Sequence, residues 1–180
     1  MYKELNLKLK SILLSDKVER RLYDTDALIP STYFNALFQA YHSRAHFLAE
    51  GIGIKHVLDW ATFLQKEQNN IDWDSYYQDC DKYHLKRFIV ALTDIAVHKL
   101  GIKVDNPRVE VDSPYSAKIL DSIMDEKSII HGTGGNDWNH RIRLVRNAVK
   151  YRWKYIEIAQ ESFIRHIIFS IWGFFFHTED

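Results

Sequence analysis

Two histidines one helical turn apart are the first residues in this sequence whose types and spacing suggest chemistry. His42 and His46 have the spacing at which two imidazoles on one helix face can bind the same metal ion, and Asp59 or Glu50 could complete the ligand shell. The pair also has a simpler use, in which both rings donate to neighbouring backbone carbonyls or carboxylates at a helix end. Without a third ligand at a fixed spacing, this structural use is the commoner one.

Two predicted helices must position these histidines. Residues 32–50 and 54–66 each show an apolar stripe of helical period, and Gly51 and Gly53 separate them. Ser31 or Thr32 is predicted to be the N-cap of the first helix, and Gly51 sits where a C-cap glycine belongs. The stripes consist of Phe34, Leu37, Phe38, Tyr41, Ala45 and Leu48 in the first helix and Ile54, Val57, Leu58, Ala61 and Leu64 in the second.

The joint between the two helices is the predicted ligand site. Glycines allow the backbone to turn sharply and to approach a ligand closely. Lys55 and Asp59 lie one turn apart in the less favourable Lys-first order and would gain little from each other as a surface pair. We therefore expect them to serve a ligand in a cleft at this joint. The predicted lining residues are His42, His46, Lys55 and Asp59.

A basic stripe near the end of the chain is a second candidate site. It accompanies an apolar pattern of near-heptad spacing that predicts one long helix over residues 142–171. The stripe could bind a nucleotide phosphate or a polyanion, although a solvated face is the commoner explanation. The aromatic residues within 169–176 would be buried or would form a docking surface. The predicted anion-binding residues are Arg143, Arg146, Lys150 and Lys154.

Three Asp-x-Asp sequences occur, at Asp24–Asp26, Asp72–Asp74 and Asp79–Asp81. Paired carboxylates of this kind can hold the divalent metal ions of nucleotidyl transfer when they lie on a strand. None of the three is predicted to lie on a strand, because the first precedes Pro30 in a turn, the second resembles an N-cap and the third falls inside a helix. We interpret all three as structural. The only glycine-rich loop, residues 131–140, lacks the Lys-Ser/Thr of a phosphate-binding loop.

The central stretch resembles a known family. The run FNALFQAYHSRAHFLAEGIGIKHVLDWATFL is similar to the pattern F-N-x-x-F-Q-x-x-H-x-x-x-H-F-x-x-E-G-I-G-L-R-x-x-x-D-[WY] of an uncharacterised nucleotidyltransferase family found in bacteria. The Leu-Arg of the pattern is Ile54-Lys55 here, which argues against a bidentate anion contact at that position.

The resemblance implies that this chain corresponds to the helical C-terminal part of such a protein. The catalytic carboxylates of the family precede the matched stretch, and the chain before Pro30 is too short for a strand-helix-strand core. Mg²⁺ and a nucleoside triphosphate would then belong to the absent core, and this chain would need no cofactor of its own. Its partner would be a missing N-terminal catalytic module or a second subunit, and its acceptor a small molecule or a macromolecule.

Composition predicts one mainly α-helical domain over residues 1–180, with several helices, a long C-terminal one and at most one short extended segment, at 103–112. Residues 3–23 are predicted to be helical and 24–31 to be a turn. The formal net charge of zero gives no general attraction to nucleic acid or anionic membranes. A single cysteine, no signal sequence and no long apolar tract predict a soluble cytoplasmic protein.

Three functions follow from these observations. The first is a helical accessory part of a nucleotidyltransferase, on the acceptor side of its site and not catalytic alone. The second is a stand-alone binding or scaffold domain that uses the basic stripe or the aromatic C-terminus. The third is metal-dependent hydrolysis at the His42–His46 pair.

Overall fold

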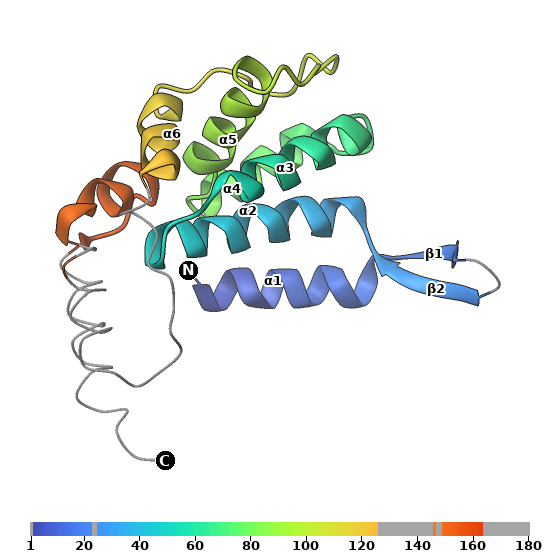
Figure 1. Cartoon of the computed structure of the whole chain (residues 1–180). Helices are drawn as coiled ribbons and strands as arrows, with labels where there is room; N and C mark the ends of the chain where they lie inside the picture. The colour runs from blue at the N-terminus through green and yellow to red at the C-terminus, as the bar shows by residue number, and fades with distance from the viewer. Residues whose placement is uncertain (1, 23–24, 126–145, 147–148, 164–180) are drawn as a thin grey trace.

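The computed structural model describes residues 2–22, 25–125, 146 and 149–163, and it confirms a mainly α-helical fold (Figure 1). Helices α1 and α2 lie side by side in opposite directions, a β-hairpin projects from one end of this pair, and residues 149–163 lie near the other end. The elements are α1 (Tyr2–Ser15), β1 (Lys17–Leu22), β2 (Thr25–Pro30), α2 (Thr32–Ala49), α3 (Ile54–Glu67), α4 (Trp73–Lys82), α5 (Lys86–His98), α6 (Ser116–Met124) and a π-helical turn, η2 (Lys154–Ile158).

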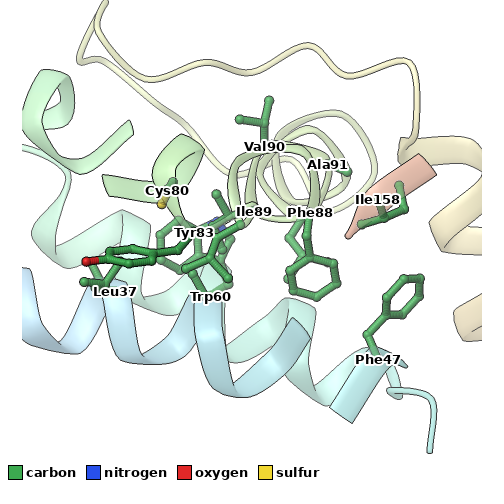
Figure 2. Packing of buried hydrophobic residues seen from close by; sticks show 14 of the residues in the cluster. Leu37, Phe47, Trp60, Cys80, Tyr83, Phe88, Ile89, Val90, Ala91 and Ile158 are labelled. Atoms are coloured by element: carbon green, nitrogen blue, oxygen red, sulfur yellow. The ribbon is translucent and has the colours of Figure 1, made fainter. Parts of the chain in front are cut away.

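Helix α5 forms the centre of the hydrophobic core. Every residue from Phe88 to Ala96 is buried, as expected for a helix that has neighbours on all sides. Phe88 points from α5 toward Phe47 of α2, with the ring centroids 5.2 Å apart (Figure 2). The buried Trp60 of α3 donates from its indole nitrogen to the Thr93 hydroxyl at 2.9 Å, so its one polar group is satisfied inside the core.

The two predicted central helices are confirmed as α2 and α3. The Ser31 hydroxyl accepts a hydrogen bond from the Phe34 amide at 3.2 Å and so caps α2. At the other end, Gly51 donates to the His46 carbonyl at 2.9 Å and has a φ of 85°, a left-handed conformation that glycine adopts without strain.

The predicted apolar stripes are wider than the buried faces of these helices. Phe38 of α2 is 41 % exposed, and Ile54 and Leu58 of α3, which were expected to face the core, are also exposed. Helical spacing identifies one side of a helix, but only the neighbouring elements determine how much of that side is covered. The sequence alone therefore does not predict that Phe38, Ile54 and Leu58 are exposed.

The largest correction concerns residues 17–30, which were predicted as the end of a helix and a turn. Residues 17–22 and 25–30 form the antiparallel hairpin β1–β2, whose register pairs Val18 with Ile29 and Glu19 with Leu28. Val18 and Leu28 are 47 % and 62 % exposed. The prediction failed because the sequences of the two strands, KVERRL and TDALIP, lack the regular alternation of apolar and polar residues that marks a half-buried strand.

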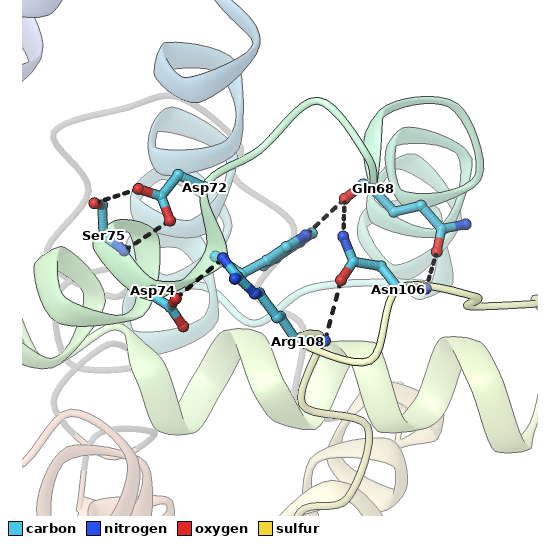
Figure 3. Close-up of polar contacts among 7 residues, drawn as sticks. Gln68, Asp72, Asp74, Ser75, Asn106 and Arg108 are labelled. Carbon is cyan, nitrogen blue, oxygen red and sulfur yellow. Dashed lines mark hydrogen bonds and ion pairs between the residues drawn. The ribbon is translucent and has the colours of Figure 1, made fainter.

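The extended segment predicted at 103–112 contains no strand. Gln68 at the end of α3 takes the place of a strand partner, because its side-chain oxygen accepts from the amides of Asp105 and Asn106 at 2.8 and 3.2 Å. Its backbone carbonyl accepts from the Asn106 side chain at 3.0 Å (Figure 3). One glutamine therefore satisfies several backbone groups of an irregular segment.

The remaining helices agree with the sequence in part. Apolar spacing in the sequence also predicts helices over residues 73–83 and 85–100 and a helix start at Ser113-Pro114. The first two correspond to α4 and α5, and the third, α6, begins at Ser116. The long helix predicted over 142–171 is interrupted in its described part, because η2 is followed by Gln160 with a φ of 52°. The rest of that prediction, the glycine-rich loop at 131–140 and the aromatic segment at 169–176 lie outside the described residues. Among the described helices, none has both the length and the apolar character needed to cross a bilayer.

Candidate functional site

An open hollow of about 440 Å³ lies between α2 and α3, next to the joint that the sequence singled out. Three of the four predicted site residues line it, namely His42, Lys55 and Asp59. Residues 38–43 of α2 form one wall, and the exposed face of α3 forms the other. The complete lining is Phe38, Gln39, His42, Ser43, Lys55, His56, Asp59 and Thr62.

A second hollow of about 570 Å³ continues the first toward the β-hairpin. The two share Gln39, Asp59 and Thr62, so they form one continuous depression. Its far end is lined by Val18 and Ile29 of the hairpin. The remaining lining residues are Pro30, Thr32, Asn35, Phe63, Lys66 and Glu67. The residues that line these two hollows are called the α2–α3 groove below.

His46 lies beside the groove as part of a cluster of three imidazoles. Its ring centroid is 4.5 Å from that of His42 and 6.0 Å from that of His56. Its Nδ1 atom is 3.8 Å from a carboxylate oxygen of Glu50. The sequence analysis missed His56, although a histidine that directly follows Lys55 in the first turn of α3 is a local signal that could have placed it at the joint.

The environment of His56 favours its neutral form. Burial of the ring lowers the pKa of His56, the Gly53 carbonyl acts in the opposite direction, and the neighbouring His46 lowers the pKa further. The Asp59 carboxylate raises the pKa, but these effects together leave it below the ordinary value. A neutral imidazole at this position can donate one hydrogen bond and accept another.

The predicted metal site at His42 and His46 has no third ligand in the described part of the chain. Nowhere among those residues do three or more His, Cys, Asp or Glu side chains come together in a way that could hold a metal ion. The metal site at this pair stays a prediction.

Side chains from the C-terminal part of the chain hold the α2 end of the joint. The last carbonyls of a helix have no partner within the helix. Here the Lys154 ammonium donates to the Phe47 carbonyl at 3.4 Å, and the Tyr155 hydroxyl donates to the Leu48 carbonyl at 2.6 Å. We call Lys154 and Tyr155 the α2 anchor. Burial lowers the pKa of Lys154 to about 8, and the side chain also lies over the rings of Phe47 and Tyr151.

The structure describes three of the four predicted anion-binding residues, namely Arg146, Lys150 and Lys154, and they differ in exposure. Lys154 is only 2 % exposed and points into the core. Lys150 is exposed, donates to the Tyr151 hydroxyl at 2.8 Å and lies 3.9 Å from Asp125. Arg146 is exposed, and Arg143 lies outside the described residues. Anion binding by this segment stays a prediction.

A family model described as an uncharacterised nucleotidyltransferase matches residues 2–101. This match covers more than half of the 180-residue chain and includes the hairpin, both helices of the groove and α5. The chain belongs to this family. No curated protein and no solved structure matches it.

Nucleotidyltransferase chemistry requires carboxylates for divalent metal ions, so the positions of the Asp-x-Asp pairs are decisive. Asp72 accepts from the Ser75 hydroxyl at 2.7 Å and caps α4, and Asp74 pairs with Arg108 at 3.2 Å (Figure 3). Asp72 thus has the N-cap role that the sequence predicted for the second pair, whereas the ion pair of Asp74 was not predicted.

The third pair is also engaged within the helical body. Asp79 accepts from the Tyr33 hydroxyl at 2.8 Å and forms an ion pair with Lys8 at 3.2 Å, whereas Asp81 lies 3.6 Å from Lys86. The first pair requires a correction, because Asp26 lies on strand β2 and not in a turn; Asp24 is outside the described residues. In this nucleotidyltransferase-family chain the second and third pairs are thus engaged in other contacts, and the described residues contain no group of three or more His, Cys, Asp or Glu side chains placed to hold a metal ion.

Proposed function

We propose that this chain is the helical, acceptor-side part of a nucleotidyltransferase and that its α2–α3 groove receives the acceptor. The observation that carries this proposal is the convergence of His42, Lys55 and Asp59 on one groove inside the region that matches the family. Acceptor recognition needs oriented polar groups in a concave site, and this groove has them.

The proposed division of labour assigns Mg²⁺ and the nucleoside triphosphate to a catalytic module, located N-terminally or on a second subunit. That module would catalyse bond formation between an acceptor oxygen and the α-phosphorus, with release of pyrophosphate. The groove would bind and orient the acceptor. Asp59 would accept a hydrogen bond from an acceptor hydroxyl, and the imidazoles would exchange hydrogen bonds with polar groups of the acceptor.

The exposed hairpin supports a docking role toward such a module. A two-stranded hairpin is at best marginally stable on its own, and no third strand accompanies β1 and β2 in the described part of the chain. Val18 pairs with Ile29, the neighbour of Leu28 on β2, so the side chains of Val18 and Leu28 lie on opposite faces of the hairpin. Both are exposed, which leaves apolar surface uncovered on each face. Strands or side chains from a neighbouring α/β module would cover this surface.

The experiment is a transfer assay with and without a catalytic module. The chain is expressed alone and together with the reading frames that flank its gene, including any frame upstream of Met1 that encodes Gly-Ser and Asp-x-Asp motifs. Labelled nucleoside triphosphates, Mg²⁺ and a metabolite extract are then supplied, and pyrophosphate release is measured. We expect transfer only from the combined protein.

Variants connect the activity to the groove. Asp59→Asn should reduce acceptor-dependent transfer strongly, whereas Asp121→Asn, an exposed aspartate of α6, is the matched control and should not. Transfer by the chain alone would contradict the proposal. Equal activity of the Asp59 variant and the control would contradict the assignment of the groove.

The other two functions stay predictions without a specific supporting contact. Binding through the basic stripe and aromatic C-terminus depends largely on Arg143 and residues 169–176, which lie outside the described residues. Hydrolysis at His42 and His46 would require further metal ligands, and no group of three or more His, Cys, Asp or Glu side chains among the described residues is arranged to hold a metal ion.

A further inference from the structure

The charges along the α2–α3 groove balance. Lys55 and Lys66 line it together with Asp59 and Glu67, so each cation is matched by a carboxylate. A ligand with several phosphates gains no net attraction from such a surface, and a strongly cationic ligand gains none either. The balance favours a ligand without net charge.

The middle of the groove carries polar groups that the fold leaves available. Gln39 and Asp59 line both hollows, and no hydrogen bond or ion pair with another described residue engages either side chain. Thr62 beside them donates its hydroxyl to the Leu58 carbonyl at 2.8 Å and retains its capacity to accept. An amide that both donates and accepts, next to two acceptors, matches adjacent hydroxyl groups, each of which can donate and accept.

An apolar strip lies beside these polar groups on α2. The rings of Phe34 and Phe38 are nearly parallel with centroids 5.8 Å apart, and those of Phe38 and His42 are nearly parallel at 5.4 Å. Phe38 remains 41 % exposed even though its neighbours stack against it. Aromatic surface next to hydroxyl-binding groups suits a molecule with C–H groups on one side and hydroxyls at its edge.

The dimensions agree with a ligand larger than one small ring. Each hollow has a volume in the range typical of small-molecule sites, and the two are continuous through Gln39, Asp59 and Thr62. The open form of the groove would allow a chain-like ligand to extend from the histidine cluster toward the hairpin.

We infer that the α2–α3 groove binds a neutral polyhydroxylated ligand of the sugar type, with Gln39 and Asp59 bonding its hydroxyls and Phe38 contacting its C–H face. The assignment of this ligand as the acceptor rests on the proposed function, whereas the binding itself does not. Lys55 and the histidine cluster would contact the end of the ligand nearest the Gly51 turn.

The test is saturation-transfer NMR on the full chain with a panel of methyl glycosides that covers the common pyranose configurations, together with maltose and cellobiose. Glucose 6-phosphate and AMP serve as charged comparison ligands. We expect at least one neutral glycoside to bind at millimolar concentration, a disaccharide to bind more tightly than its monosaccharide, and the charged ligands to bind more weakly.

Variants decide whether the binding belongs to the groove. Gln39→Ala, Asp59→Asn and Phe38→Ala should each weaken the best glycoside about tenfold or more, because each removes a direct contact. Asp121→Asn should leave the affinity unchanged, and the melting temperature of each variant, measured in parallel, shows that it is folded. Absence of binding by every neutral glycoside, or binding insensitive to all three groove variants, would overturn the inference.

This outcome is separable from that of the transfer assay. Glycoside binding without nucleotidyl transfer by the combined protein would contradict the proposed function and support the sugar site. Transfer to an acceptor without hydroxylated rings, at a site sensitive to Asp59→Asn, would support the proposed function and overturn the sugar inference.

Discussion

The two sides of α2 differ in how far their side chains and carbonyls are packed and hydrogen-bonded within the protein. On the core side, Phe47 packs against Phe88, and the α2 anchor occupies the carbonyls of the last turn. On the groove side, Phe38 is 41 % exposed, and the Gln39 side chain makes no hydrogen bond with another described residue. One helix therefore separates a surface that stabilises the fold from one that is available to a ligand, and substitutions on the two sides should have different consequences.

The largest difference is expected between two phenylalanines. Phe88→Ala should lower the free energy of unfolding by about 3–5 kcal/mol, because it opens a cavity in the centre of the core. Phe38→Ala, on the groove side, should cost less than about 1 kcal/mol. Urea denaturation of both variants measures the contrast. Similar losses would show that the groove side is part of the core.

Lys154→Met should change how stability depends on pH. The pKa of Lys154 is about 8 in the folded protein and 10.5 when unperturbed, so between these values the unfolded chain binds more protons. The contribution of Lys154 to the unfolding free energy should therefore rise with pH in this window, by at most about 1.4 kcal/mol per unit. The rise should be clearest between pH 8 and 9.0, because burial raises the pKa of Cys80 above its ordinary value of 9.0 and this group opposes the rise at higher pH.

In the Lys154→Met variant this rise should be absent. Denaturation curves at pH 7 to 10.5 give the comparison, and Lys150→Met, which replaces an exposed lysine nearby, is the control. Equal slopes for the native protein and the Lys154 variant would show that the ammonium is not buried in solution.

Tyr155→Phe tests the other half of the α2 anchor by removing one oxygen atom. The loss of its hydrogen bond leaves the buried Leu48 carbonyl without this donor, and the expected cost is about 1–2 kcal/mol. Thermal unfolding of Tyr155→Phe and of Tyr115→Phe, a partly buried tyrosine near α6, provides a matched pair. If the anchor does not contribute, the two variants will melt alike.

The smallest effect on stability is expected at Asp59. Asp59→Asn should leave the unfolding free energy nearly unchanged because the side chain is exposed, but it should lower the pKa of His56 further, since the carboxylate raises it. NMR titration of the histidine ring protons measures the shift, with Asp121→Asn as the control. An unchanged His56 pKa would show that Asp59 does not reach the imidazole cluster.

Local signals explain which parts of the fold the sequence predicts. The cap at Ser31, the glycine at Gly51 and two apolar stripes locate α2 and α3, because each signal acts within a few residues of its own position. The same spacing placed His42, Lys55 and Asp59 near one joint, where the structure shows them lining one groove.

Long-range contacts explain what the sequence does not predict. The hydrogen bond from Lys154 to the Phe47 carbonyl joins residues 107 positions apart. The regular spacing of basic residues around Lys154 therefore does not indicate that its side chain is buried. The hairpin was missed because the sequences of its two strands lack the regular alternation of apolar and polar residues that marks a half-buried strand. His56 becomes part of the imidazole cluster only because α2 places His46 next to it, a contact that its local sequence does not show.

The α2 anchor also has a consequence for the order in which the protein folds and opens. Its contacts close a loop of 107 positions, and the entropy of closing a long loop is compensated only when many other contacts are already formed. The end of α2 should therefore be secured late in folding and released early in local unfolding, while α5 remains protected. In hydrogen exchange, the amides of Glu50 and Gly51 should exchange well before those of residues 89–96. The histidine end of the groove would then open transiently by local unfolding of the end of α2, while the core around α5 stays folded.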